Sequence, residues 1–192
     1  MPSGTTLSGG WPWFARLVAG SFLFLAGVSL WLAHGRGIRW RPFLRRLGVL
    51  ALAAAGITLA TWLAMPERFV FFGILHSIAV CGVLGLAFLR LPAGATLAAA
   101  VLVLLAPGVL RSEAFDAPAL VWLGLSTWRP TTMDFEPVFP WLAPCLAGIA
   151  LARLAGRTGI WPRLAVLGQG RTAQAMAWPG RHSLWVYLIH QP

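Results

Sequence analysis

The chain has 192 residues, of which 58% are hydrophobic and only 10% are charged, and its mean hydropathy is +0.76. Soluble domains carry about 25% charged residues, so this composition excludes a soluble enzyme or a soluble binding domain. The formal net charge of +10 has no soluble basic face to carry it, so nucleic acid is not an expected partner. We expect instead an all-α bundle of transmembrane helices embedded in the lipid bilayer.

The apolar stretches predict the helices in chain order. They are about 17 to 21 residues long, enough to cross a hydrocarbon core of roughly 30 Å. We expect five full spans, at residues 13–33, 47–65, 69–89, 93–109 and 137–154. A sixth begins near Ser183 and stops at Pro192, and its length of about 15 Å covers half a bilayer. No loop has room for a soluble domain, so residues 1–192 are expected to form a single membrane domain.

The arginines predict the orientation, because cytoplasmic loops are enriched in basic residues. Eleven arginines fall on one side of the predicted spans: Arg36, Arg39, Arg41, Arg45, Arg46, Arg90, Arg153, Arg157, Arg163, Arg171 and Arg181. All five acidic residues fall on the other side. This pattern places the N-terminus outside, in a bacterial cytoplasmic (inner) membrane. Because nothing upstream carries that end across, we expect a missing first helix and a missing C-terminal end, or else a wrong start site or a short paralogue.

His76 is the first candidate for chemistry, within the stretch FFGILHSIAVCG. It lies beside a stripe of small residues at four-residue spacing, namely Gly73, Ser77, Cys81 and Gly85. Such stripes let helix backbones approach closely, so His76 is expected to face the bundle, about 10 Å below the outer end of its helix. It serves either as a neutral histidine bonded across helices or as a functional group. Cys81 and Cys145 are interpreted as packing residues, not as a disulfide.

His190 closes the last apolar run, SLWVYLIHQP. Counted from His182, it lies about 12 Å above the inner boundary, in the same middle band of the membrane as His76. A neutral imidazole takes up and returns a proton near pH 7, which general acid/base catalysis requires. No carboxylate occurs within a predicted span to orient either ring, so the pair alone is a weak constellation.

Two polar segments flank the spans. The outer loop at residues 111–141 combines Trp128 with Asp134 and Glu136, a pattern that suits stacking on a sugar and hydrogen bonding to its hydroxyls. An interfacial aromatic belt explains the same residues. On the other side, the run RGIRWRPFLRR contains Arg39, Arg45 and Arg46, which suit the phosphates of a nucleotide-bearing donor, although topology alone also accounts for them. No spacing of residues predicts a metal site.

Four stretches resemble a known family: GSFLFLAGVSLWLAHGRG, ITLATWLAMPERFVFFGILHSIAV, FPWLAPCLAGIALAR and GRHSLWVYLIHQP. They are similar to the bacterial branch of the heparan-alpha-glucosaminide N-acetyltransferase catalytic-domain family, over nearly the whole chain. The resemblance implies an integral membrane acyltransferase-like protein that uses cytosolic acetyl-CoA as co-substrate. Family members open with a helix carrying an Asp-Ala-Arg-Gly-type start and a His followed by an Asp. This chain has neither, so the family's early catalytic histidine cannot be placed on His76 or His190.

Under this resemblance, the chain transfers an acetyl group to a sugar amine or hydroxyl at or beyond the outer face. His76 is then the best candidate base or positioning group, and His190 a second polar group along the acyl path. Tyr187 and Gln191 are its candidate hydrogen-bond partners. The alternatives are a non-catalytic membrane protein, either transporter-like or a packing subunit, and an inactive truncated member. A continuous polar cleft lined by His76 and His190 favours the enzyme, and a closed, dry bundle favours packing.

Overall fold

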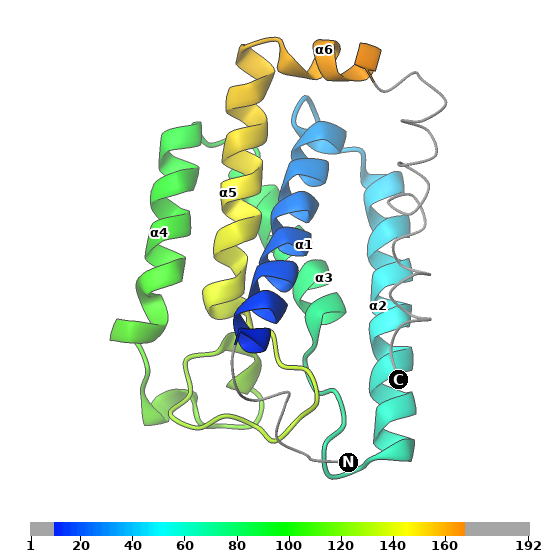
Figure 1. Ribbon diagram of the computed structural model, residues 1–192, viewed down its shortest axis with the longest axis vertical. Helices are drawn as coiled ribbons and strands as arrows, with labels where there is room; N and C mark the ends of the chain where they lie inside the picture. Colours follow the sequence, from blue (N-terminus) through cyan, green and yellow to red (C-terminus); the bar gives the residue numbers. More distant parts are fainter. Residues whose placement is uncertain (1–9, 168–192) are drawn as a thin grey trace. The chain divides into compact units, whose positions relative to one another are not determined.

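The computed structural model describes residues 10–167, and in this range the chain is helical, with no strand (Figure 1). The helices are α1 (Trp11–His34), α2 (Trp40–Ala64), α3 (Ile74–Phe88), α4 (Ala93–Val109), α5 (Val138–Arg157) and α6 (Ile160–Leu167). Two short 3-10 helices, η1 (Glu113–Phe115) and η2 (Val121–Leu123), lie in the loop between α4 and α5. The all-α prediction is confirmed. The sixth span predicted from Ser183 lies outside the described residues.

The chain divides into two compact units, residues 1–153 and 154–192. The first contains the helical bundle, in which α1 to α5 run alternately in opposite directions (Figure 1). The second contains α6, an eight-residue helix that the sequence reasoning missed. The bundle carries every contact discussed below.

Three of the five expected spans are long and apolar enough to cross a membrane: α1 over Trp13–His34, α2 over Trp40–Ala64, and α5 over Val138–Arg157. The apolar helices α3 and α4 have only 15 and 17 residues. At 1.5 Å per residue these two helices measure about 22 and 26 Å, less than a hydrocarbon core of about 30 Å. The chain is therefore an integral membrane protein by its apolar helices, and five full spans are not confirmed.

The prediction of a helix over residues 69–89 is wrong at its start. Residues 69–73 are not helical, and Gly73 is extended, because this segment pairs with the loop that precedes α5. The Met133 N–H donates to Arg68 O and the Glu136 N–H to Phe72 O, each at 3.0 Å. These bonds hold the backbone of this segment away from a helical conformation. His76 is thus the third residue of α3, about 3 Å from its start, and the expected depth of about 10 Å is wrong.

Helix α2 begins at Trp40, seven residues earlier than the expected start at residue 47. Pro42 is compatible with this start, because the first turn of a helix leaves its backbone N–H groups without intrahelical partners. Arg41, Arg45 and Arg46 therefore stand on the first two turns of α2 and not in a loop.

The close crossing of α1 and α5 depends on two glycines. A Cβ atom on Gly27 would collide with the backbone carbonyl of Cys145, and one on Gly148 with the carbonyl of Phe24. Each helix thus presents a glycine to the backbone of the other. Lipid provides no hydrophobic drive for helix association, so close van der Waals contact of this kind is what joins two membrane helices.

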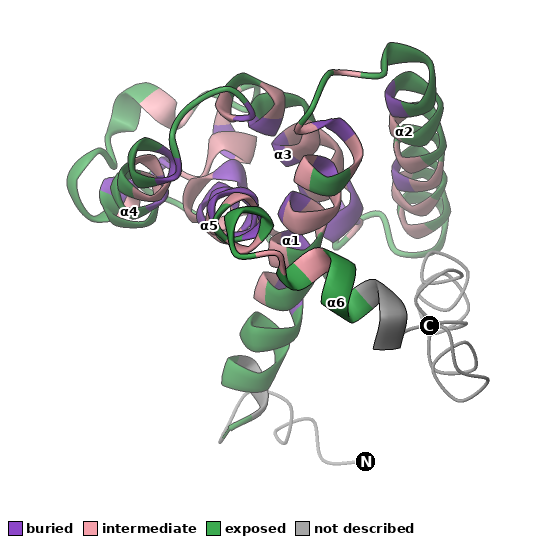
Figure 2. Cartoon of the chain, turned by 90° about the horizontal axis from the view of Figure 1, so that it is seen from above, coloured by how far each residue is buried: buried purple, intermediate pink, exposed green. Residues whose placement is uncertain are grey.

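The predicted small-residue stripe on α3 is buried, as expected. Ser77 and Cys81 have no exposed surface, and Gly85 lies between Leu30 of α1 and Ile149 of α5. Figure 2 shows buried residues gathered where α1, α3 and α5 meet, while α2 is largely exposed. Cys81 and Cys145 are both free and buried, which confirms their interpretation as packing residues.

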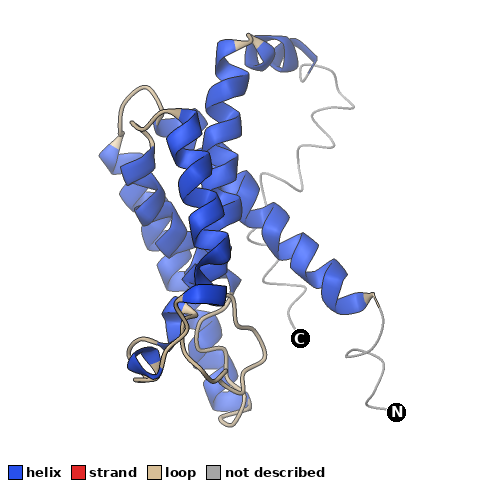
Figure 3. Cartoon of the chain, turned by 90° about the vertical axis from the view of Figure 1, so that its left-hand side faces the viewer, coloured by secondary structure: helices blue, strands red, loops and turns tan. Residues whose placement is uncertain are grey.

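The two ends of the bundle differ in charge. Arginines surround the connections between α1 and α2 and between α3 and α4, where the guanidinium of Arg153 donates to the backbone carbonyl of Leu89. The long loop between α4 and α5 lies at the other end (Figure 3). This segregation follows the expected arginine pattern, and the side that each end faces stays a prediction.

Replacing Gly27 by Ala is expected to destabilise the bundle by about 1–3 kcal/mol, because the added methyl forces α1 and α5 apart. Gly56→Ala on α2 is the matched control, since its Cβ meets no atom within 4 Å. That control is expected to gain up to about 1 kcal/mol of helix stability. Thermal unfolding in detergent measures both variants. Equal melting temperatures for the two would contradict the close crossing.

Candidate functional site

A carboxylate from the distant loop caps the start of α3. The Ile74 N–H donates to Oδ2 of Asp134 at 2.9 Å, although the two residues are 60 positions apart. A helix N-terminus has backbone N–H groups without intrahelical partners and favours negative charge, so Asp134 stabilises this turn. Gly73 leaves the room, since a Cβ there would collide with the same carboxylate.

Further bonds complete this connection, which we call the α3 clasp (residues 132–136). The Thr132 hydroxyl donates to Phe69 O at 2.6 Å, and Phe72 and Phe135 form a parallel bridge. Together with the backbone bonds at Met133 and Glu136, they fix the segment before α3 on the loop. The clasp therefore determines where α3 begins and where His76 lies.

Two threonines of α2 hold the same segment from the other side. The Thr58 hydroxyl donates to Val70 O at 2.8 Å, and the Val70 N–H donates to the Thr61 hydroxyl at 3.0 Å. Thr58 Oγ1 also lies 3.4 Å from Nε2 of His76. Its one proton is used at Val70, so Nε2 of His76 must be the donor in that contact. A neutral His76 then has Nδ1 as its basic nitrogen, a tautomer assigned from the hydrogen bonds.

One aromatic ring, that of Phe72, lies against His76. The Phe72 ring lies 5.6 Å from the imidazole, centroid to centroid, and Trp122 lies 5.8 Å from Phe72 on the loop side. His76 itself is half-buried. Its ring is thus held by Thr58 and Phe72 in one orientation, facing α2 as well as the bundle interior.

Two acidic side chains accompany the clasp. Burial raises the pKa of Asp134, and the bond from the Ile74 N–H opposes that rise. Burial and then the neighbouring Asp134 raise the pKa of Glu136 to about 8, against the opposite effect of Arg129 and Arg16. Oε2 of Glu136 is buried and has no hydrogen-bond partner among the described residues. Glu136 is therefore largely protonated at neutral pH.

The predicted site residues are only partly brought together. The clasp brings Asp134 and Glu136 to the helix start that carries His76, which the sequence spacing of about 60 residues did not reveal. Trp128 lies earlier in the loop, outside the clasp, and is 45% exposed. His190, Tyr187 and Gln191 lie outside the described residues. The sequence analysis did not identify Thr58 or Phe72. Thr58 is one of a pair of threonines in an apolar helix, and Phe72 is an aromatic residue about one turn before the histidine. These two patterns were the available signals.

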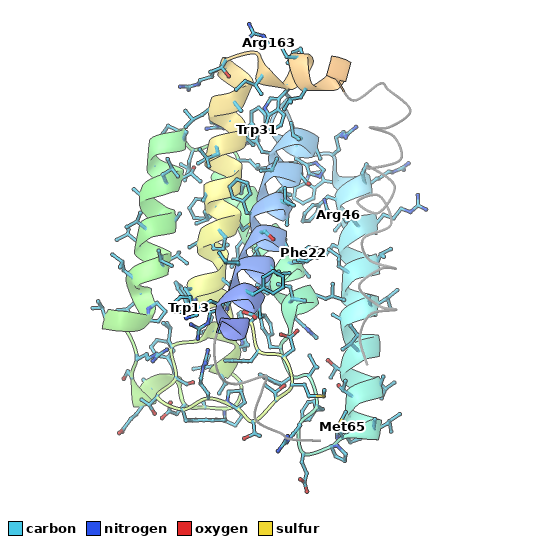
Figure 4. The ribbon with its side chains drawn as sticks, in the orientation of Figure 1. Trp13, Phe22, Trp31, Arg46, Met65 and Arg163 are labelled. Atoms are coloured by element: carbon cyan, nitrogen blue, oxygen red, sulfur yellow. The ribbon has the colours of Figure 1, made fainter. Side chains whose placement is uncertain are left out.

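The predicted phosphate-binding arginines divide into two groups. Arg45 and Arg46 line an open groove of about 520 Å³ on α2, with Arg41, Pro42 and Val49. Figure 4 shows Arg46 toward the N-terminal end of α2, away from Met65. Arg39 is not part of that groove lining, and its backbone N–H donates to Nδ1 of His34 at 3.2 Å.

His34 is a functional candidate that the sequence reasoning missed. It is the last residue of α1, only 7% exposed, and its ring meets the Phe43 ring edge-on at 5.7 Å. It lines a cavity of about 30 Å³ between α1, α2 and α3. In the sequence, His34 directly follows the predicted span 13–33 and falls in the expected loop. In the structure α1 extends to His34, and Phe43 of α2 lies against its ring.

Comparison with known proteins identifies one family. The whole chain, residues 1–192, matches the family described as "Heparan-alpha-glucosaminide N-acetyltransferase, catalytic". A search of curated proteins and a search of solved structures each gave no match. The resemblance drawn from the four sequence stretches is thereby confirmed.

Removal of the Asp134 carboxylate is expected to loosen the start of α3. Asp134→Ala removes a helix-capping acceptor, at a cost of about 1 kcal/mol, whereas Asp134→Asn retains an oxygen that accepts from Ile74. Hydrogen exchange at the first turn of α3 measures the effect. Asp116→Ala is the control, because that carboxylate accepts from Thr127 within the loop and touches no helix start. Unchanged protection at Ile74 in Asp134→Ala would contradict the cap.

The raised pKa of Glu136 predicts a pH-dependent stability. The folded protein holds a proton that the unfolded chain, with its ordinary pKa of 4.5, releases. The free energy of unfolding therefore falls as pH rises from about 4.5 to about 8, and then levels off. Glu136→Gln is expected to reduce this slope, as read from melting temperatures in detergent across that range. Glu113→Gln, at an exposed carboxylate of the same loop, is expected to retain it.

Proposed function

Because the chain belongs to the heparan-alpha-glucosaminide N-acetyltransferase catalytic family, we propose that it transfers an acetyl group from a cytosolic acetyl-CoA-type donor to a sugar amine or hydroxyl at or beyond the outer face. Family membership supports a membrane acyltransferase-like activity, and the donor and the acceptor are our proposal. The observation that carries it is the fixed ring of His76, with its Nε2 against Thr58 and its Nδ1 left as the basic nitrogen.

His76 is proposed as the base. Acetyl transfer requires a group that takes the proton from the attacking amine or hydroxyl, and a neutral imidazole is suited to this near pH 7. The bond to Thr58 fixes the tautomer, and the ring of Phe72 fixes the orientation. Positioning of this kind is what turns a histidine into an efficient base.

The acceptor is proposed to bind at the loop end, near the clasp. Trp128 is exposed and offers a face on which a sugar can stack. Glu136 offers Oε2, an oxygen without a partner among the described residues, for a hydroxyl or an amine. Asp134 already accepts from Ile74 through one oxygen, so its contribution to binding comes from the other.

The donor is proposed to bind at the arginine-rich end, which then faces the cytoplasm and leaves the N-terminus outside, in a bacterial inner membrane. Arg45 and Arg46 share an open groove with Arg41, where several guanidinium groups are available for phosphates. Arg39 flanks that groove at the start of α2. We further propose that α3 and α4 complete their crossings with their flanking segments, giving five spans, and that His190, Tyr187 and Gln191 line the acyl path.

One observation favours a non-catalytic packing role instead. His76 is not among the residues that line the cavity near the arginines. In that case His76 serves only as a hydrogen-bonded link between α2 and α3. The two proposals differ in whether acetyl-CoA is consumed.

His76→Ala is expected to lower acetyl transfer by about 10²–10⁴-fold, because the reaction loses its base. The measurement is acetyl-CoA consumption by the purified chain with a panel of amino sugars. Thr58→Val is the companion variant, since it frees the ring but leaves the imidazole, and a smaller loss is expected. Wild-type turnover in His76→Ala, at an unchanged melting temperature, would assign the histidine to packing.

A further inference from the structure

The open groove on α2 lies on the side of the helix that faces away from the bundle. Phe43 and Ala54, the buried residues of α2, are about three turns apart and share one face. Arg41 and Arg45 stand on either side of Phe43 in the sequence, each about 160° around the helix axis from it. Both are exposed, and Figure 2 shows α2 at the edge of the bundle. The groove therefore opens toward the lipid that surrounds a membrane helix.

Apolar side chains continue the face that carries these two arginines. Val49, Leu52 and Leu59 are 48%, 76% and 54% exposed. Val49 and Leu52 follow Arg45 by about 6 and 10 Å along the helix axis. One leaflet contributes about 15 Å of hydrocarbon, which is half of a core of roughly 30 Å. The face is thus cationic at one end and apolar over the depth of one lipid chain.

Trp40 indicates the depth of the arginines in the membrane. It is the first residue of the candidate span Trp40–Ala64 and is 56% exposed. Tryptophan is enriched where lipid headgroups meet hydrocarbon. Arg41 follows it directly, and Arg45 lies about one turn deeper, where the long stem of an arginine still brings its charge to the interface. Both guanidinium groups are therefore expected at the level of the lipid phosphates.

The chain provides no acid close to these arginines. Its first acidic residue is Glu67, beyond the opposite end of α2, and the other four lie in the loop between α4 and α5. Arg41 and Arg45 are about one turn apart, which places their Cβ atoms about 5–6 Å from each other, so both side chains can converge on one anion. The guanidinium fork matches the oxygens of a phosphate. The anion that this pair suits therefore comes from outside the chain.

We propose that the groove binds an anionic phospholipid, with its phosphate on Arg41 and Arg45 and one acyl chain along Val49 and Leu52. The volume of about 520 Å³ falls within the range of small-molecule sites, about 300–1,000 Å³. A headgroup with no ammonium, as in phosphatidylglycerol, is preferred over phosphatidylethanolamine, whose own ammonium offsets the charge of its phosphate. The inference goes beyond the proposed function and does not depend on it.

The lipid and the proposed donor share the chemistry of a phosphate, and their positions on α2 differ. Arg46 lines both the groove and the cavity that contains His34, so it stands on the side of α2 nearer the bundle. Arg41 and Arg45 line the groove and not that cavity. With the lipid on this outward pair, the donor is left with Arg39 and Arg46.

Native mass spectrometry of the full chain in detergent, titrated with phosphatidylglycerol or with phosphatidylethanolamine, counts the bound lipids. The wild type is expected to retain phosphatidylglycerol at lower lipid concentrations than phosphatidylethanolamine. Arg41→Gln and Arg45→Gln are each expected to weaken the retention of phosphatidylglycerol about fivefold, the contribution of one arginine near an anionic lipid. Arg90→Gln is the matched control, because it removes an exposed charge at the same end of the bundle but outside the groove, and retention is expected to be unchanged.

A second variant tests the site without touching either guanidinium. Val49→Trp fills the groove from its apolar end, so the retention of phosphatidylglycerol is expected to fall at an unchanged melting temperature. Leu102→Trp, at a position of α4 that is 70% exposed, is its control and is expected to retain the lipid as the wild type does.

Three results would overturn the inference. Equal retention of the two lipids by the wild type, or an equal loss in Arg45→Gln and Arg90→Gln, would reduce the arginines to a general positive charge. Displacement of phosphatidylglycerol by CoA would assign the groove to the donor. A lipid-free dimer in the same spectra would assign this face of α2 to a second copy of the chain. Acetyl transfer is measured separately, so its failure is distinguishable from the failure of the lipid site.

Discussion

The hydrogen bond from the Ile74 amide to the Asp134 carboxylate joins two segments that are 60 residues apart in the chain. Around it, the extended segment before α3 pairs with the clasp, and Thr58 and Thr61 of α2 hold that segment from the opposite side. These contacts shorten α3 and fix its first turn. The orientation of His76, the burial of Glu136 and the course of the long loop all follow from where α3 begins.

Helix α3 also links the two ends of the bundle. Its small residues allow it to pack against α1 and α5, while the face that begins at His76 turns toward α2. The acidic loop lies at the first turn of α3, and the cavity with His34 and Arg46 lies farther along the same helix. His76 donates to Thr58 of α2, and His34 accepts from the N–H of Arg39, the residue before α2. Each bond fixes one tautomer of the neutral ring.

This arrangement places one acidic side chain of the long loop, Glu136, in an energetically unfavourable environment. Glu136 is placed where burial and Asp134 disfavour its charge, and one of its oxygens has no partner among the described residues. Stable folds rarely leave buried polar groups unpaired, and such groups gather at functional sites. The acidic loop, the fixed imidazole and the family membership therefore point to the same end of the bundle as the place of acceptor chemistry.

The helices themselves could largely be predicted from hydropathy, and α4 was predicted to the residue at both ends. The stripe on α3 correctly indicated a buried face, since small residues at four-residue spacing lie on one side of any helix. Helix starts were the errors. A hydropathy scale assigns the apolar residues 69–73 to the helix. Nothing in their local sequence indicates that their backbone pairs with the clasp.

What the sequence determined, then, was the membrane class, the order of the apolar helices, the segregation of arginines and the family, because all four depend on composition and short-range pattern. Only the tertiary structure decided that Asp134 caps α3, that Thr58 orients His76, and that His34 is buried beside Arg46. Each of these contacts joins different helices or a helix and a distant loop. Their geometry depends on how the backbones cross, at Gly27 and Gly148 above all, and a linear pattern carries no record of that crossing.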